Sequence, residues 1–171
     1  MKKMLIIVLS LSLGITGTIY LGIDSTPEME IEANGYSGSG DLDGGGITIG
    51  YNHPVYQKEK MGVAVGGSYN LVGLDIGDDE EVGFLSVYAL PTYSINDKMM
   101  AWFSLGFNMP THDGDDLDTG LTYGLGAHYK FNEKMGVGIG YVVNQTTGDF
   151  YVPNMDAEFS RLAVFVGYSL K

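Results

Sequence analysis

The residues best suited to binding an ion lie in three acidic stretches that also contain glycine. The candidate ligands in these stretches are Asp41, Asp43, Asp78, Asp79, Asp113, Asp115 and Asp118. Carboxylate oxygens are the ligands that Ca²⁺ and Mg²⁺ prefer, but no stretch matches the twelve-residue calcium loop with its terminal Glu. The same carboxylates could form a solvated, mutually repelling rim, or bridge to anionic lipid headgroups through divalent cations. They are candidate cation-binding loops, and no specific metal site is predicted.

Residues for catalysis are sparse. The three histidines, His53, His112 and His128, lie in separate segments, and the chain has no Cys to serve as a nucleophile or a zinc ligand. A Ser-His-Asp triad is assembled in space, so spacing alone does not exclude one. No other motif points to a reaction. We therefore predict that the protein is not an enzyme and uses no cofactor.

The composition favours strands and excludes nucleic acid as a partner. The 171 residues include 26 Gly and 12 Tyr, a mixture that disfavours a helix bundle. With 21 acidic and 9 basic side chains the formal charge is −12, and Arg161 is the single Arg. Neutralising phosphates requires clustered Lys and Arg. The chain lacks such a cluster.

The N-terminus has the layout of a secretory signal peptide. A Met-Lys-Lys start is followed by the apolar run Met4–Ile15 and then by Thr16-Gly17-Thr18. The run is shorter than the ~20 residues that a membrane-spanning helix needs, although an uncleaved anchor is the alternative. We predict a signal peptide over residues 1–17, cleaved near Gly17 or Thr18, and one exported domain over residues 18–171.

From Met29 onward the chain divides into eight runs that alternate in polarity and end at turn-forming residues. The predicted strands are Met29–Ser37, Gly45–Tyr56, Met61–Leu74, Val82–Ile95, Met99–Met109, Thr119–Phe131, Met135–Gln145 and Phe159–Leu170. The segment Thr18–Glu28 is left open. It is either a short extra strand, or the real first strand with a longer first loop after it.

The two faces of the predicted strands suit a barrel in lipid. In the sixth run Leu121 and Leu125 share an apolar face, while the opposite face holds small or polar residues such as Thr122 and Gly124. A soluble barrel would instead place charged residues on its outer face. Small side chains fit the narrow interior of eight strands, and the large apolar face suits lipid. Trp102 also falls on the inward face, so either the register shifts there or its ring fills the lumen.

The connections between the runs alternate in length and charge. Three short turns each carry Lys, whereas the four longer connections hold fourteen acidic residues and neither Lys nor Arg. Alternate connections of an up-and-down meander lie at opposite ends, and outer-membrane barrels have short periplasmic turns and longer external loops. We predict an all-β, eight-stranded antiparallel up-and-down transmembrane β-barrel with both termini at the short-turn end.

Few ionisable residues fall on the predicted inward face. They are Glu30, Glu32, His128, Lys130 and Arg161. The first four are placed toward the short-turn end, where they could form a buried charge network, since an enclosed charge needs a partner. Such a network would neutralise the lumen and help to close it. A proton or ion pathway is the alternative, and Arg161 is placed near the loop end, facing the acidic rim.

The C-terminal strand Leu162–Leu170 alternates apolar residues and has aromatic residues near its end. The chain over residues 29–171 resembles the small eight-stranded outer-membrane β-barrels of Gram-negative bacteria, of the OmpA/OmpX and opacity, porin-like type. The resemblance implies that the barrel assembly machinery reads this strand as an insertion signal. The chain departs from the family pattern by ending in Ser-Leu-Lys after Tyr168, and not in Phe.

The leading functional hypothesis is a monomeric outer-membrane barrel with a plugged lumen and a structural or surface-interaction role. Its expected partners are outer-membrane lipid and, during biogenesis, the assembly machinery. A narrow ion-conducting pore or an adhesin is the first alternative. A soluble lipocalin-like barrel that binds an apolar ligand is the second.

Overall fold

The structure is a computed structural model that describes residues 16–42, 45–77, 80–111, 117–148 and 155–170. Its strands are β1 (Gly17–Ala33), β2 (Tyr36–Asp41), β3 (Ile47–Lys58), β4 (Met61–Val72), β5 (Leu74–Gly77), β6 (Glu80–Ser94), β7 (Met99–Thr111), β8 (Gly120–Lys130), β9 (Met135–Gly148) and β10 (Met155–Leu170). No helix in the described part is long and apolar enough to cross a membrane.

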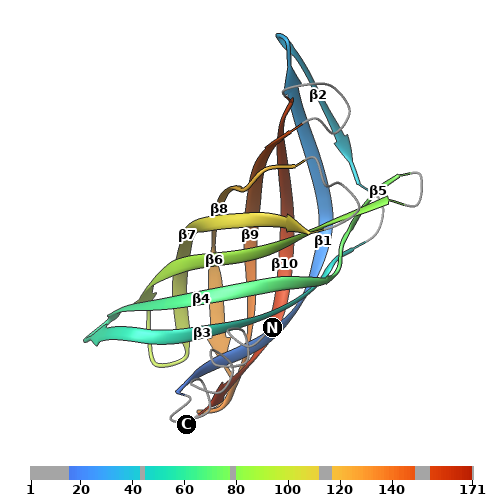
Figure 1. Ribbon diagram of the computed structural model, residues 1–171. Coiled ribbons are helices and arrows are strands. Elements are labelled where there is room, and N and C mark those ends of the chain that lie inside the picture. Colours follow the sequence, from blue (N-terminus) through green and yellow to red (C-terminus); the bar gives the residue numbers. More distant parts are fainter. Residues whose placement is uncertain (1–15, 43–44, 78–79, 112–116, 149–154, 171) are drawn as a thin grey trace, which may run out of the picture.

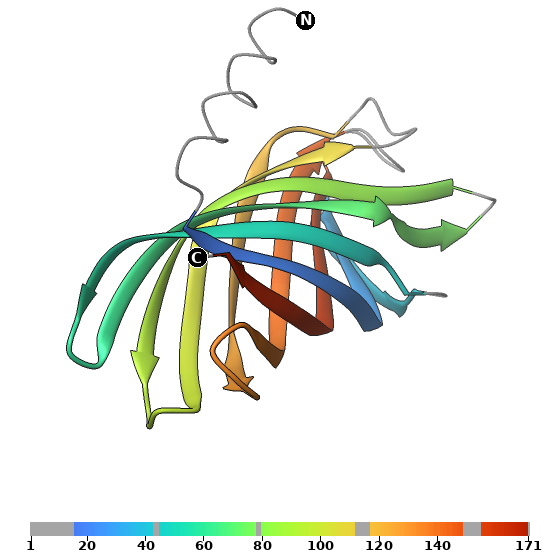
Figure 2. The same ribbon diagram turned by 90° about the horizontal axis from the view of Figure 1, so that it is seen from below.

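Eight of these strands form a closed ring. Strands β1, β3, β4, β6, β7, β8, β9 and β10 pair in that order, and antiparallel pairing of β10 with β1 closes the barrel. Figure 2 shows the first strand, in blue, lying beside the last, in red. The remaining two strands are additions, because β2 extends β1 and β5 pairs with β6 (Figure 1). The predicted eight-stranded up-and-down barrel is confirmed.

The two ends of the barrel differ. At one end, the turn end, lie the connections 59–60, 95–98 and 131–134, and the ends of the described chain, since Gly17 pairs with Leu170. At the other end, the loop end, lie the longer connections together with β2 and β5. The predicted placement of short turns and chain ends is therefore correct.

The predicted first strand, Met29–Ser37, is wrong. Strand β1 begins at Gly17, and Asn34 and Gly35 then turn the chain with positive φ angles of 52° and 80°. Asn-Gly is a preferred pair for a two-residue hairpin turn, because both residues tolerate the left-handed conformation. The predicted strand Met29–Ser37 therefore included the tip of the hairpin between β1 and β2. Of the two alternatives for Thr18–Glu28, the true first strand is the correct one.

A β-bulge in β1 changes which residues face the lumen. The register against β10 shifts shortly after Asp24, where Thr26 has a φ of 45°. Asp24 is buried on the inner face, but beyond the bulge Met29 takes that face and Glu30 and Glu32 are exposed. An extra residue in one strand inverts the alternation of every residue after it. The predicted inward orientation of Glu30 and Glu32 is therefore wrong.

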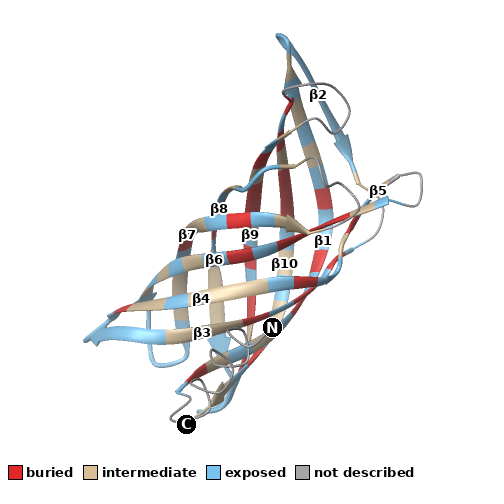
Figure 3. Ribbon diagram, in the orientation of Figure 1, coloured by how far each residue is buried: buried red, intermediate tan, exposed pale blue. Residues whose placement is uncertain are grey.

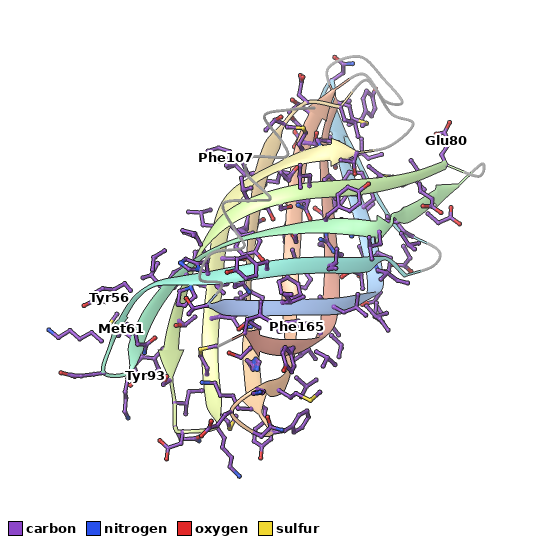
Figure 4. The ribbon with its side chains drawn as sticks, turned by 60° about the horizontal axis from the view of Figure 1, so that its bottom comes forward. Tyr56, Met61, Glu80, Tyr93, Phe107 and Phe165 are labelled. Atoms are coloured by element: carbon purple, nitrogen blue, oxygen red, sulfur yellow. The ribbon has the colours of Figure 1, made fainter. Side chains whose placement is uncertain are left out.

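The outer wall of the barrel is apolar and exposed. Ile23, Phe107 and Leu125 have exposed fractions of 63%, 61% and 61% on the outer face. In Figure 4 Phe107 points away from the barrel, while Phe165 lies inside it. A soluble domain would bury such residues, but the hydrocarbon of a bilayer solvates them. A closed ring also pairs the backbone groups that lipid cannot satisfy.

Large inward side chains lie over glycines of the neighbouring strands. The Trp102 ring covers Gly126 and Gly140, and a Cβ atom at either glycine would collide with it. Phe165 covers Gly138 in the same way. At these three positions the absence of a Cβ atom leaves space for an aromatic ring inside the barrel. Trp102 thus faces the lumen without a shift in register.

Two of the short turns share one construction. The Asn96 side-chain oxygen accepts hydrogen bonds from the backbone N–H groups of Lys98 and Met99, each at 2.9 Å. Asn132 does the same for Lys134 and Met135, at 2.8 and 2.9 Å. An Asn side chain that caps its own turn stabilises this backbone conformation. The repeat of Asn, an acidic residue, Lys and Met therefore encodes a repeated hairpin.

Aromatic residues surround the turn end of the outer wall. Tyr56 and Tyr93 are exposed there, close to Met61 (Figure 4). Tyr129 and Phe131 pack edge to face, with ring centroids 5.7 Å apart. Amphipathic rings at this level are typical of the aromatic girdle at a membrane interface.

A charge on the apolar wall should destabilise the inserted barrel. We expect Leu125→Arg, near the middle of β8, to lower the free energy of unfolding in phospholipid vesicles by about 2–4 kcal/mol, the cost of a cation near the bilayer midplane. Tyr36→Arg, on the exposed strand β2, should change it by less than about 0.5 kcal/mol. Denaturant unfolding followed by tryptophan fluorescence measures both. Equal effects would contradict the assignment of the wall to lipid.

Candidate functional site

A buried ion pair on the inner face of the barrel joins the first and last strands, which are neighbours in the closed ring. Arg161 Nε on β10 lies 3.1 Å from Asp24 Oδ2 on β1, and the two side chains are 5% and 1% exposed. The Arg161 Nε–H makes no hydrogen bond to that oxygen, so this contact is an ion pair only. Thr48 donates a hydrogen bond to the same Oδ2 at 3.0 Å, and Asn70 donates another at 3.3 Å. The Asp24 carboxylate is therefore buried with Arg161 beside it and with two side-chain hydrogen-bond donors on the same oxygen.

Further polar residues extend this pair across the barrel. Arg161 Nη1 donates to Asn144 Oδ1, and Asn144 Nδ2 donates to Ser86 Oγ at 3.4 Å. Asn70 Oδ1 accepts a hydrogen bond from the Phe84 N–H at 3.0 Å. We call these connected side chains the polar belt: Asp24, Thr48, Asn70, Ser86, Asn144 and Arg161. They come from six of the eight barrel strands, so the belt ties distant parts of the ring together.

An apolar cluster lies on the loop side of the polar belt. It consists of Leu74, Val82, Phe84, Met155, Ala157 and Phe159, and we call it the apolar cap. Each side chain is at most 3% exposed, and the rings of Phe84 and Phe159 lie 5.4 Å apart. Strand β5 contributes Leu74 from outside the ring. Figure 3 shows the buried segments gathered toward this end, on β6, β9 and β10 among others.

Aromatic and polar side chains line the lumen on the turn side of the belt. Tyr20 and Tyr88 share a hydrogen bond of 2.7 Å between their hydroxyl groups, and Tyr88 donates to Asn52 Oδ1 at 3.1 Å. The Trp102 and Phe165 rings lie 6.0 Å apart. These side chains surround a cavity of about 110 Å³, and we call this part of the lumen the lower chamber.

The predicted lumen charge network does not form. His128 and Lys130 lie at the turn end, as predicted, but Glu30 and Glu32 lie at the opposite end of β1 and face outward. Among the described residues, the ion-pair partner of Arg161 is Asp24 on β1. The bulge in β1 and the misplaced first strand account for these errors. The structure therefore replaces the predicted network by the polar belt.

Glu30 and Glu32 belong instead to an acidic array on the outer face at the loop end. Glu30 lies directly opposite Glu158, and Glu32 lies opposite Asp156, on the paired strands β1 and β10. Like charges directly opposite each other destabilise a sheet. Glu158 Oε2 accepts hydrogen bonds from Gln145 at 2.8 Å and from Tyr123 at 3.3 Å, which offset part of this repulsion.

The candidate cation-binding loops are largely untested. Asp43, Asp78, Asp79, Asp113 and Asp115 lie outside the described residues. The other two candidates, Asp41 and Asp118, are exposed. Within the described part of the chain, His, Asp and Glu side chains nowhere form a group of three or more that could hold a metal ion.

The described histidines do not assemble with a nucleophile. His53 lies on β3 and contacts the Thr16 carbonyl oxygen through Nδ1 at 2.7 Å and the Tyr51 hydroxyl at 3.2 Å. His128 faces the lumen, where its ring packs 6.2 Å from Phe165. His112 lies outside the described residues. The described residues therefore offer no arrangement suited to acyl transfer.

Sequence reasoning missed the central carboxylate of the lumen. Asp24 follows an alternating segment in which Tyr20 and Gly22 share its face, and that parity would have placed it inward. Because the segment was left unassigned, Asp24 could not be recognised as the partner of Arg161. Asn70 and Asn144 did fall on the small, polar face of their predicted strands, but their partners are set by the closed ring.

Comparisons with known proteins agree with this architecture. The family model "Outer membrane protein beta-barrel domain" matches residues 9–169. No curated protein sequence matches the chain significantly.

Similar solved structures include outer-membrane barrels from three bacteria. The attachment invasion locus protein Ail of Yersinia pestis is 17% identical, with a TM-score of 0.52, over 91% of this chain and 100% of that chain. Neisserial surface protein A is 14% identical, with a TM-score of 0.52, over 90% and 99% of the two chains. The outer membrane protease OmpT of Escherichia coli is 5% identical, with a TM-score of 0.51, over 91% and 97%. At these identities the likeness concerns the fold, which hosts both an enzyme and other proteins.

Breaking the ion pair of the belt should be costly. We expect Asp24→Ala to lower the free energy of unfolding by about 3–5 kcal/mol, because it leaves the Arg161 charge buried without its partner. The double variant Asp24→Leu, Arg161→Met should recover most of that loss, since it removes both charges. Ser37→Ala on exposed β2 is the control. Unfolding in vesicles measures all three, and a neutral Asp24→Ala would refute the buried pair.

Proposed function

Because the chain belongs to the outer membrane protein beta-barrel family, we propose that this outer-membrane barrel is a non-conducting surface protein whose acidic loop end meets the environment. The observation that carries the proposal is the pair of obstructions in the lumen. The polar belt crosses it between six strands, and the apolar cap follows on the loop side. An eight-stranded barrel is just wide enough for such side chains to fill.

The charge distribution supports a role at the cell surface. All five lysines of the described residues, Lys58, Lys60, Lys98, Lys130 and Lys134, lie at the turn end. The loop end carries the acidic array of Glu30, Glu32, Asp156 and Glu158. Strands β2 and β5 extend this end beyond the ring (Figure 1). A projecting acidic surface favours cationic partners, which is compatible with an adhesin-like role.

Two further features belong to the proposal. The protein acts as a monomer without enzyme activity, and the barrel assembly machinery inserts it by reading β10. A monomer is favoured by the ring itself, because the barrel strands leave no open edge in the membrane. The ion-conducting pore is the competing function. The soluble lipocalin-like alternative is excluded by the family and by the exposed apolar wall.

Single cysteines should report which end faces outward. The chain has no Cys, so Tyr36→Cys on β2 and Lys98→Cys in a short turn each create one unique thiol. We expect a membrane-impermeant maleimide to label Tyr36→Cys on intact cells, and Lys98→Cys only after the outer membrane is permeabilised. Gel-shift quantification of the label measures this. The reverse pattern would contradict an external acidic end.

Conductance separates a closed barrel from a pore. In planar bilayers we expect the wild-type barrel to give no sustained unitary current steps, because the belt and the cap block the lumen. Heat-modifiable gel migration confirms that the sample is folded. Reproducible current steps that scale with the amount of inserted protein would contradict the non-conducting proposal and favour the ion-conducting pore.

A further inference from the structure

The lumen contains a blind well that opens at the turn end. The lower chamber of about 110 Å³ adjoins a vestibule of about 540 Å³ at the mouth of the barrel. The two spaces lie next to each other, because Asn52, Leu90, Met100 and His128 belong to the walls of both. Their combined size is within the range of small-molecule sites in proteins. Toward the loop end the well stops at the polar belt, because Asp24 and Arg161 form part of the chamber wall.

The walls of the well are more apolar than an open, water-filled lumen requires. Leu90 and Met100 face inward and are half-buried, and the rings of Trp102 and Phe165 line the inner chamber. Val63 and Ala64 contribute to the vestibule. Apolar surface that faces water gains free energy when an apolar group covers it. The well is therefore suited to a hydrocarbon chain.

The mouth of the well carries cationic side chains. Lys130 and Lys134 line the vestibule, and both are exposed. Glu133 and Asn132 also line the vestibule next to these lysines. Glu133 interacts with another group of the protein. His128 lines both the vestibule and the chamber, so it lies at their shared boundary. Ammonium groups at the entrance to an apolar well complement an anionic headgroup.

From this geometry we propose that the barrel binds a single-chain anionic amphiphile, such as a fatty acid, in the well from the turn end. Its hydrocarbon chain lies along Leu90 and Met100 toward Trp102, and its headgroup lies near Lys130 and Lys134. The polar belt limits how deep the chain reaches. The well is a binding site and not a route across the membrane, because the belt and the cap stand between it and the loop end.

The only Trp of the chain provides a direct probe of the chamber. With the full chain reconstituted in phosphatidylcholine nanodiscs, 11-bromoundecanoate should quench Trp102 fluorescence saturably, because bromine quenches at short range. Excess dodecanoate should reverse the quenching. Competition by dodecanoate assigns a fatty acid, whereas competition by lysophosphatidylglycerol alone assigns a phosphate headgroup. Either result supports the proposed class of ligand.

Two matched pairs of lysine variants test the headgroup. Lys130→Gln and Lys134→Gln remove charges at the mouth, and we expect each to weaken apparent binding about two- to fivefold. Lys58→Gln and Lys60→Gln remove equivalent charges from one hairpin end, where neither lysine lines the vestibule, and should leave binding unchanged. All four lysines are exposed, so the barrel should fold normally, as heat-modifiable migration checks.

Three results would overturn the proposal. The first is quenching by 11-bromoundecanoate that does not saturate and equals the quenching by brominated phosphatidylcholine, since the bromine would then act from the bilayer. The second is equal quenching in all four lysine variants. The third is quenching that neither excess dodecanoate nor lysophosphatidylglycerol reverses, since the bromine would then not occupy a site that binds an anionic amphiphile.

Discussion

The pairing of β10 with β1 is the constraint on which the rest of the structure depends. Hydrocarbon offers no partner to a backbone N–H or C=O group, so a sheet in a bilayer must close on itself. Here closure runs from Gly17 to Glu32 on β1, matched with Leu170 to Asp156 on β10. Once the ring is closed, every barrel strand has two neighbours. Its outer face must be apolar, and its inner face must fill a narrow space.

The side chains that fill the narrow interior are arranged in layers along the barrel axis. Trp102 and Phe165 lie over glycines of neighbouring strands, so their rings fit inside a ring of only eight strands. The ion pair of Asp24 and Arg161 lies further toward the loop end, with amide and hydroxyl groups that satisfy its remaining bonding capacity. Beyond it, Phe84 and Phe159 are sealed from water. A buried pair of this kind adds little net stability, because the cost of desolvating both charges offsets their attraction.

Charge is also divided along the barrel axis. Lysines and an Asn-capped turn repeat occupy the turn end, while the carboxylates opposite each other on β1 and β10 occupy the loop end. The repulsion between these carboxylates is tolerated because water screens it outside the membrane. The same division makes the proposed ligands of the two ends chemically opposite: cationic partners at the loop end, and an anionic amphiphile at the mouth of the well.

Local pattern was enough to determine the class of fold. Alternation such as that of Leu121–Leu125, and the Lys-bearing short turns, predicted eight strands, their direction and the lipid-facing side. Pattern did not determine the orientation of Glu30 and Glu32, because one bulge near Thr26 inverts the parity of all later residues in β1. Nor did it pair Asp24 with Arg161, since these residues are distant in the chain and become neighbours only when the ring closes. The alternation of side chains between two faces can be recognised in a short segment of sequence. The pairing register of the strands, and which side chains meet in the lumen, are determined by the closure of the ring.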